Sequence, residues 1–238
     1  MNGSELLTLK NLCVWYTVDS PVLSDFSLKL GTHEVVGLIG LNGAGKTTFI
    51  KTLSGLLHGY RLDAAAYHGE AFAFRDETFK QNRYTVLSED HSFQYFTFQE
   101  YLSYVATSYG KAMAEADISE LVQGFHFEEY TDILLKELST GNLKKAYLIT
   151  AFALHPELLL LDEPVNGLDF QSTEYLYQLM ENYKEYGTIL FSSHVLESIC
   201  LTSDRVIVLE QGRIRRTFTG KEIEATNIRE VLSSNEDT

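Results

Sequence analysis

The amino-acid sequence predicts an α/β fold built on a parallel sheet, and three of its segments support this prediction. Residues 34–39 are mostly apolar and lead into a glycine-rich loop, after which apolar residues recur at helical spacing. Residues 158–161 are consecutive leucines, a run typical of a strand buried on both faces of a parallel sheet. Residues 188–191 predict a further short strand. Strands that alternate with helices in this way indicate a sheet covered by helices.

Composition and charge limit the classes of protein to which this chain can belong. The 238 residues suffice for one large domain, and the formal net charge is −14. Such a charge opposes binding to nucleic acid and to anionic lipid surfaces. The sequence has no apolar run near the ~20 residues that a membrane-spanning helix needs, and its first residues do not look like a signal peptide. We therefore expect a cytoplasmic protein that binds no nucleic acid and keeps Cys13 and Cys200 as reduced core thiols.

Residues 6–30 predict antiparallel strands that precede the parallel sheet. Apolar and polar residues alternate on both sides of the turn signal at residues 19–21. Tyr16 ends the first of these strands, where an aromatic ring can stack on a nucleotide base; an ordinary aromatic of the core or of a strand edge is the alternative. Short strands are also expected at residues 71–74 and 83–87.

The middle of the chain is expected to be helical. Thr97 and Glu100 form a capping box, and the apolar residues after it recur at helical spacing. A second short helix has the same pattern, so residues 93–138 indicate a helical insertion. Ser139 is expected to cap a helix of about residues 143–154, which is either an ordinary capped helix or a second anion site. A helix after residue 169, a hairpin around Gln211-Gly212 and a last helix at residues 223–232 complete the chain.

The glycine-rich loop carries the strongest functional signal. It reads Gly40-Leu41-Asn42-Gly43-Ala44-Gly45-Lys46-Thr47-Thr48 and matches the phosphate-binding P-loop. The glycines let the backbone curl so that successive N–H groups point at phosphate oxygens, and the helix that begins at Lys46 adds its positive dipole end. Lys46 can reach the β- and γ-phosphates, and the Thr47 hydroxyl can ligate Mg²⁺. The strand before the loop and the helix after it favour this interpretation over a glycine-rich turn in an unrelated α/β protein.

Polar side chains follow two other predicted strands. Asp162 and Glu163 end the leucine run, at the edge where α/β sheets bind ligands. Asp162 is suited to hold Mg²⁺, and Glu163 is suited to polarise a water molecule. His194 follows the strand at residues 188–191; a lone histidine there is usually structural, but the parallel sheet should bring it close to Asp162.

These pieces, in this order, resemble the ATP-binding domain of ABC transporters over roughly residues 6–232. A P-loop alone occurs in many ATPases and GTPases, so the resemblance depends on the whole set: the P-loop, Leu-Ser-x-Gly at 138–141, Asp-Glu-Pro at 162–164, Gly-Leu-Asp at 167–169 and Ser-Ser-His at 192–194. It implies a P-loop NTPase (RecA-like) core with an N-terminal antiparallel β subdomain and an inserted helical subdomain. The single domain of residues 1–238 would then divide into the core with its β subdomain (1–92 and 139–238) and the helical subdomain (93–138).

The resemblance also implies a mechanism. Two copies would stack head to tail, with each ATP held between the P-loop of one copy and the Ser139 segment of the other. Glu163 would act as the base toward water, with His194 and Lys46 as the other catalytic residues. Asp169 would lie in the loop that links the two sites. The nucleotide-binding residues would be Tyr16, Gly40, Asn42, Gly43, Ala44, Gly45, Lys46, Thr47, Thr48, Ser139 and Gly141. The metal ligands would be Thr47 and Asp162, with Ser88 or Glu89 as a further candidate.

Three positions depart from the family pattern. The signature reads Ser-Thr-Gly-Asn where the family usually has Ser-Gly-Gly-Gln, and Lys145 stands where the family has an arginine. Where the family carries the glutamine of its Q-loop, this chain has Ser88 followed by Glu89. Ser88 could ligate Mg²⁺ or its water, and Glu89 could do so more strongly if the loop shifts.

The main hypothesis is therefore the ATPase subunit of a membrane transporter, with ATP and Mg²⁺ as cofactors. A separately encoded integral-membrane subunit, a homodimer or paired ABC subunit, and a place on the inner face of the cell membrane are implied with it, and export is favoured over import by analogy. Phe93, Tyr95, Phe96 and Tyr104 are candidate contacts to that subunit. The alternatives are a soluble ABC ATPase that acts on ribosomes or DNA, which the charge opposes, and a nucleotide sensor with little turnover.

Overall fold

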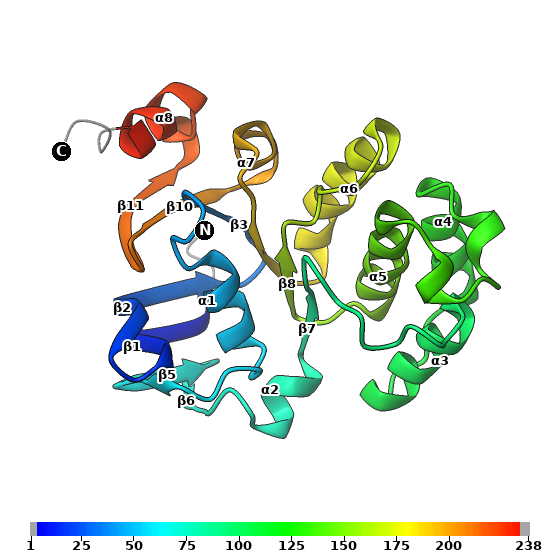
Figure 1. Ribbon diagram of the computed structural model, residues 1–238, viewed down its shortest axis with the longest axis horizontal. Helices are drawn as coiled ribbons and strands as arrows, with labels where there is room; N and C mark the ends of the chain where they lie inside the picture. Colours follow the sequence, from blue (N-terminus) through cyan, green and yellow to red (C-terminus); the bar gives the residue numbers. More distant parts are fainter. Residues whose placement is uncertain (1–3, 234–238) are drawn as a thin grey trace.

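The computed structural model describes residues 4–233, and its larger sheet has six strands in the order β11-β10-β3-β9-β8-β7 (Figure 1). Neighbouring strands are parallel except β10 and β11, which form the predicted hairpin. The strands are β3 (Val35–Ile39), β7 (Arg83–Val86), β8 (Leu158–Asp162), β9 (Thr188–Ser192), β10 (Arg205–Glu210) and β11 (Arg213–Thr219). The predicted α/β fold with a parallel sheet is confirmed.

Both faces of the parallel sheet are buried. Leu158 and Leu160 of β8 pack into a core shared with the second sheet and with α1 (Lys46–Leu53). Leu159 and Leu161 pack into the core on the opposite face, beneath the other helices. Because side chains of a strand point alternately to the two faces, a strand covered on both sides needs apolar residues at every position.

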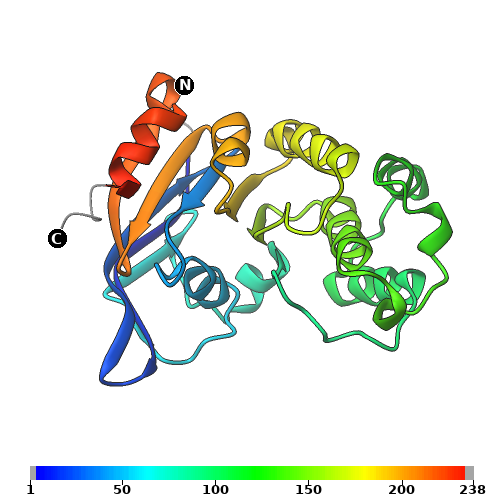
Figure 2. The same cartoon turned by 45° about the horizontal axis from the view of Figure 1, so that its top comes forward.

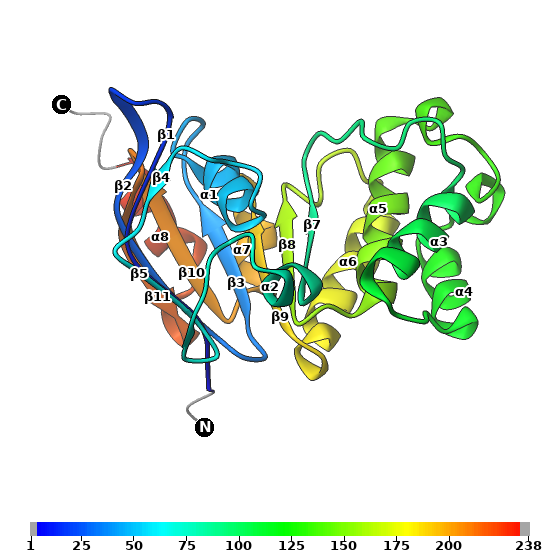
Figure 3. The same ribbon diagram turned by 90° about the horizontal axis from the view of Figure 1, so that it is seen from below.

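The second sheet is antiparallel and lies at one end of the molecule (Figures 1 and 3). Its order is β2-β1-β5-β6, with β4 also paired to β1. The strands are β1 (Glu5–Thr17), β2 (Ser20–Gly31), β4 (Tyr60–Arg61), β5 (Ala64–Tyr67) and β6 (Glu70–Ala71). The predicted strand at residues 71–74 is wrong beyond its first residue: Phe74 is buried against both Tyr60 and Phe72 but belongs to no strand. β1 pairs with the alanine-rich β5, and no local sequence pattern predicts this long-range pairing.

Helices cover the face of the parallel sheet opposite the antiparallel sheet. They are α5 (Thr140–Leu154), α6 (Phe170–Asn182), α7 (Leu196–Thr202) and α8 (Ala225–Ser233), with the 3-10 helices η3 (Tyr183–Glu185) and η4 (Gly220–Glu222). α5 begins at Thr140 rather than near residue 143, because Ser139 caps it. Figure 2 shows α8 alongside β10 and β11. A short helix, α2 (Glu77–Gln81), was not expected from the sequence and buries Phe79.

The remaining helices lie at the end of the molecule opposite the antiparallel sheet (Figure 3). They are α3 (Phe98–Tyr109), α4 (Glu115–Gly124), η1 (Glu128–Tyr130) and η2 (Leu135–Glu137). The capping box at Thr97 and Glu100 is confirmed, since each accepts a hydrogen bond from the other's backbone N–H. Phe98, Tyr101, Leu102 and Val105 are buried, as the periodicity predicts. The domain boundaries at residues 92/93 and 138/139 stay a prediction. No helix in residues 4–233 is long and apolar enough to span a membrane.

Candidate functional site

The loops after four neighbouring strands, β3, β9, β8 and β7, meet at the carboxyl edge of the parallel sheet. This is the edge at which open α/β sheets bind their ligands. A cleft of about 570 Å³ lies there and is lined by Val22, Asn42, Gly43, Ala44, Gly45, Lys46, Thr47, Thr48, Ser88, Glu163, Asn166 and His194. Segments far apart in the sequence thus contribute to one polar cleft.

The loop between β3 and α1 depends on its glycines for two different reasons. Gly43 and Gly45 have φ angles of 82° and 104°, a region that only glycine adopts without strain. Gly40 has no positive φ, but a methyl group there would lie 2.2 Å from the Leu209 carbonyl oxygen of β10. The expectation that all three glycines serve to curl the backbone is therefore incomplete, because Gly40 is needed for close packing.

Lys46 begins α1 and is buried in the loop. Its Nζ donates to the Gly40 carbonyl oxygen at 2.8 Å, while its side chain lines the cleft. Tyr16 approaches the same loop from β1, with its hydroxyl 3.4 Å from Thr48 Oγ1. Tyr16 is 61% exposed, so it is no core residue, and it lies beside the residues that line the cleft without lining it itself.

Three hydroxyl groups converge on the fully buried carboxylate of Asp162. Thr47 Oγ1 donates to both carboxylate oxygens at 3.0 Å, Ser88 Oγ donates to Oδ2 at 2.8 Å, and Ser192 Oγ donates to Oδ1 at 2.7 Å. Hard oxygen donors of this kind suit Mg²⁺, which is usually held by one or two carboxylates together with substrate phosphates. Within the described residues, no group of three or more His, Cys, Asp and Glu side chains is placed to hold a metal ion.

Glu163 turns away from Asp162 and contacts His194. Its Oε2 accepts from the His194 backbone N–H at 3.2 Å and lies 2.8 Å from His194 Nδ1. The backbone N–H of Glu163 donates to Ser192 Oγ at 3.0 Å. Glu163 has a φ of 49°, which is strained for a residue with a side chain, and such strain is concentrated at functional sites.

The segment that begins α5 lies outside this cleft. Ser139 is exposed, and its hydroxyl accepts from the Asn142 N–H at 3.2 Å, so the predicted N-cap is confirmed. A methyl group on Gly141 would lie 2.3 Å from the Gly167 carbonyl oxygen, so this glycine is needed where α5 meets the turn before α6. Neither Ser139 nor Gly141 lines the cleft of their own chain.

A family model described as ABC transporter matches residues 23–166 of this chain. The chain belongs to this family. AlbC of Bacillus subtilis (strain 168), which bears the name of an ABC transporter ATP-binding protein, is 36% identical over 218 residues that cover 90% of this chain and 91% of AlbC. Nod factor export ATP-binding protein I of Burkholderia orbicola (strain AU 1054) is 34% identical over 193 residues, 79% of this chain and 62% of that protein.

A solved structure of an ATP-binding subunit of an ABC transporter superposes with a TM-score of 0.81 at 30% identity, covering 96% of this chain and 95% of that chain. The P-loop NTPase fold expected from the sequence is confirmed. ABC ATP-binding proteins hydrolyse ATP to drive transport, and this chain is an ATPase of that family.

The loop after β7 distinguishes between the two candidate replacements for the family's glutamine. Ser88 lines the cleft and contacts Asp162. Glu89 is exposed and lines a separate hollow between this loop, η2 and α5. Glu89 as a metal ligand stays a prediction, since in this structure its residue lines that hollow and not the cleft.

The sequence reasoning missed Ser192 and Lys144. Ser192 was noticed only as part of Ser-Ser-His, yet its hydroxyl joins Asp162 to the Glu163 backbone. Lys144 is a buried lysine of α5 whose Nζ donates to backbone oxygens of the loop after β7. Two consecutive lysines before the apolar part of this helix were the available signal.

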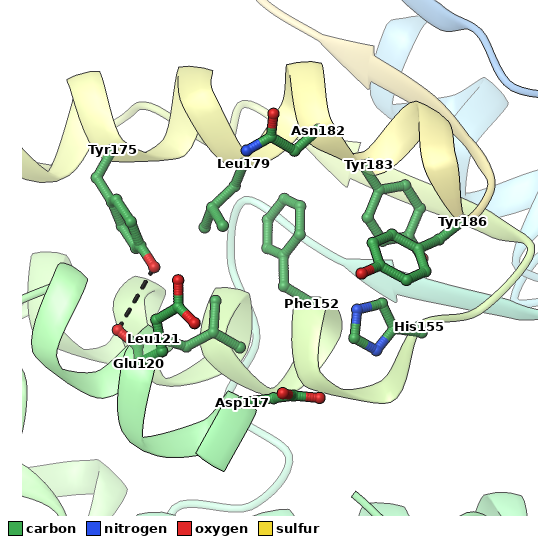
Figure 4. A pocket seen from close by; sticks show the side chains of 10 residues that line it. All are labelled: Asp117, Glu120, Leu121, Phe152, His155, Tyr175, Leu179, Asn182, Tyr183 and Tyr186. Carbon is green, nitrogen blue, oxygen red and sulfur yellow. Dashed lines mark hydrogen bonds between the residues drawn. The ribbon is translucent and has the colours of Figure 1, made fainter. Parts of the chain in front are cut away.

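A smaller hollow of about 180 Å³ lies between α4, the end of α5 and α6 (Figure 4). His155, Tyr183 and Tyr186 gather at one end of it, and Asp117 and Glu120 of α4 border it. Burial lowers the pKa of His155. None of the predicted nucleotide-binding or catalytic residues lines this hollow.

Proposed function

We propose that this chain is the ATP-hydrolysing subunit of an ABC transporter, which dimerises around two Mg-ATP and drives a separately encoded membrane subunit. The observation that carries the proposal is the convergence of Thr47, Ser88 and Ser192 on Asp162, beside the Glu163–His194 pair. A P-loop, a metal-suited carboxylate and a candidate base in one cleft are the components that phosphoryl transfer to water requires.

ATP would bind along the P-loop with its adenine on the ring of Tyr16. The amides of residues 42–48 and Lys46 Nζ would then bind the polyphosphate, which would draw Lys46 Nζ from the Gly40 carbonyl oxygen. Because Tyr16 is exposed beside the loop, its ring would stack on the adenine. Such stacking would add to the affinity without selecting one base over another.

Mg²⁺ would be held by Thr47 Oγ1 and by the Asp162 carboxylate, directly or through water, with Ser88 Oγ as a third oxygen. When bound, Mg²⁺ neutralises charge on the β- and γ-phosphates. Thr47 and Ser88 now donate to Asp162, so each hydroxyl is already within reach of the position that the metal would share.

Glu163 would accept a proton from the attacking water as the oxygen attacks the γ-phosphorus. Its Oε2 is engaged by His194, which fixes the carboxylate and leaves Oε1 for the water. His194 is 53% exposed at its side chain, so its ring can also reach a γ-phosphate oxygen in the cleft.

A second copy would complete the site. Ser139 keeps one hydroxyl proton for a phosphate oxygen while it accepts from Asn142, since a hydroxyl donates once and accepts twice. The amides at the beginning of α5 and its dipole add a positive field. Their position outside the cleft of their own chain supports a role toward the ATP of the partner copy. Asp169, which caps α6 and pairs with Lys145 at 2.7 Å, would lie in the loop between the two sites.

The membrane subunit would dock near the loop after β7. A hollow of about 300 Å³ there is lined by residues that include Glu89, Asp90, Leu135, Lys136 and Tyr147. Such docking would place the chain on the inner face of the cell membrane. The relative named for Nod factor export supports export as the direction. The Glu163–His194 pair favours turnover over a nucleotide sensor with little turnover.

The proposed dimer is tested by sedimentation of Glu163→Gln, which should bind ATP without consuming it. Two copies with a net charge of −14 repel each other, so we expect monomers without nucleotide and dimers with Mg-ATP, favoured by moderate salt. Lys46→Ala is the control, because it should lose nucleotide and remain monomeric. A dimer that forms equally without nucleotide would contradict the proposal.

A further inference from the structure

Lys144 is buried and forms no salt bridge within residues 4–233, although the carboxylates of Asp162, Glu163 and Asp90 act on its charge from farther away. Lys144 belongs to α5, and only 4% of it is exposed. Nζ donates to the Leu87 carbonyl oxygen at 2.9 Å and is 3.4 Å from the Ser88 carbonyl oxygen. Burying an ammonium group is costly, and a methionine would fill the same space without that cost. A lysine at this position therefore indicates that its contact with the loop after β7 has a function.

The next residue of α5 makes a different contact. Lys145 is also buried, but its Nζ pairs with Asp169 in the turn before α6. Consecutive residues of a helix point about 100° apart. The two lysines consequently attach the first turns of α5 to two loops, one after β7 and one after β8, the strand that ends at Asp162.

Lys144 is connected to the Asp162 carboxylate through Ser88. The backbone of Ser88 accepts from Lys144, and the hydroxyl of the same residue donates to Asp162 Oδ2. Asp162 in turn accepts from Thr47 of the P-loop. A continuous series of polar contacts thus connects α5, whose first residues would face a second copy in the proposed dimer, to the metal-suited site of its own chain.

We propose that Lys144 is a positioning residue, which holds the Ser88 hydroxyl at the Mg²⁺ site and couples the orientation of α5 to that site. The inference rests on the proposed function of Asp162 and Thr47. Ser88 stands where the family has a glutamine. Lys144 and Ser88 would together make the contact with the Mg²⁺ site that a longer side chain at position 88 would make alone. Movement of α5 on contact with a second copy would then shift Ser88 relative to Asp162.

The test measures the Mg²⁺ concentration that half-maximally enhances binding of a fluorescent ATP analogue. For Lys144→Met we expect this concentration to rise about tenfold, which is the worth of one hydrogen bond to a charged group, while Mg²⁺-free binding stays within about twofold. Amide hydrogen exchange at residues 87–90 should become faster. Lys144→Arg should recover most of both effects, because a guanidinium can donate to the same carbonyl oxygens.

Lys145→Met is the matched control, since it removes an adjacent buried lysine. It should leave exchange at residues 87–90 unchanged and speed exchange at residues 166–170. Ser88→Ala should raise the Mg²⁺ requirement, and adding Lys144→Met to it should raise the requirement little further, because the two changes act on one contact. Additive effects would overturn the role of Lys144.

The outcomes separate this inference from the proposed function. Wild-type protein without Mg²⁺-dependent nucleotide binding would contradict the proposed site and the inference with it. Normal wild-type binding with an unchanged Mg²⁺ curve for Lys144→Met would overturn only the role of Lys144. If Lys144→Met does not fold, Lys144→Gln takes its place, because glutamine keeps one donor to the loop without the charge.

Discussion

The ring of His194 and the carboxylate of Glu163 meet at 2.8 Å between Nδ1 and Oε2. The backbone N–H of His194 donates to the same oxygen, so the histidine contacts one side of the carboxylate twice. An ionised carboxylate oxygen only accepts, so a hydrogen bond from the ring to an ionised Glu163 requires a proton on Nδ1. The pair therefore holds the Glu163 side chain in place before any substrate binds.

Glu163→Gln should lower the rate of ATP hydrolysis by ~10²–10⁴-fold, the usual contribution of a positioned base. The amide keeps the shape of the side chain but cannot take the proton of the attacking water. ATP affinity should persist because Lys46 and the loop amides are untouched. Release of phosphate and equilibrium binding of ATP are the two measurements. Wild-type turnover in this variant would exclude Glu163 as the base.

Tyr16→Ala should weaken ATP binding by about tenfold, since stacking of a base on an aromatic ring is worth ~1–3 kcal/mol. The affinity for inorganic tripolyphosphate, measured by competition, should not change, because it has no base. Tyr16→Phe keeps the ring and loses only the 3.4 Å contact to Thr48, so it should bind ATP nearly as wild type does. An equal loss of ATP and tripolyphosphate binding would assign Tyr16 to the loop rather than to the base.

The Lys145–Asp169 pair should make stability depend on pH. The Lys145 ammonium, helped by the Ser172 N–H, holds the pKa of Asp169 well below its ordinary value of 3.8. Because the unfolded chain then binds the proton more readily, the contribution is complete above pH 3.8 and is lost as the pH falls through the folded-state pKa. Unfolding free energies of wild type relative to Lys145→Met should therefore decline in acid. A difference that is constant with pH would contradict the pairing.

Tyr95→Ser should impair transport by the assembled complex and leave the ATPase rate of the isolated subunit nearly unchanged. Tyr95 is 75% exposed, and Lys136 Nζ lies 4.7 Å from its ring centre, beside the hollow after β7. Such an exposed aromatic is suited to anchor a partner helix. Tyr186→Ser is the matched control, because Tyr186 is exposed but lines the hollow of Figure 4. Equal effects of both changes would remove Tyr95 from the docking surface.

The sequence also suggested Phe93 and Phe96 for the same surface, and their role there stays a prediction. Both rings are half-buried: Phe93 packs against Tyr101 and Tyr104, and Phe96 packs against Phe93 and Tyr104. Phe96→Ser would thus lower stability as well as any docking, so it cannot report on docking alone. The pattern of aromatics before the capping box was visible in the sequence, but exposure depends on which rings pack together.

The sequence by itself determined the features whose physical cause is local. The P-loop, the buried strand at residues 158–162, the capping box at Thr97 and the N-cap at Ser139 each depend on residues close together in the chain. Hydrophobic periodicity and capping chemistry act over a few residues, so the pattern indicates them directly. The short strands β5 and β6 and the helix α2 lie where this local signal is weak, and there the sequence-based prediction failed.

Only the tertiary structure decided which side chains share a site. Ser88 meets Asp162 and Glu89 does not; Ser192 joins Asp162 to Glu163. Lys144 reaches the loop after β7 across 57 positions of the chain. These contacts follow from the strand order β3-β9-β8-β7, which brings distant loops to one edge of the sheet. A contact between distant residues depends on how the strands pair, and no short stretch of sequence encodes that pairing.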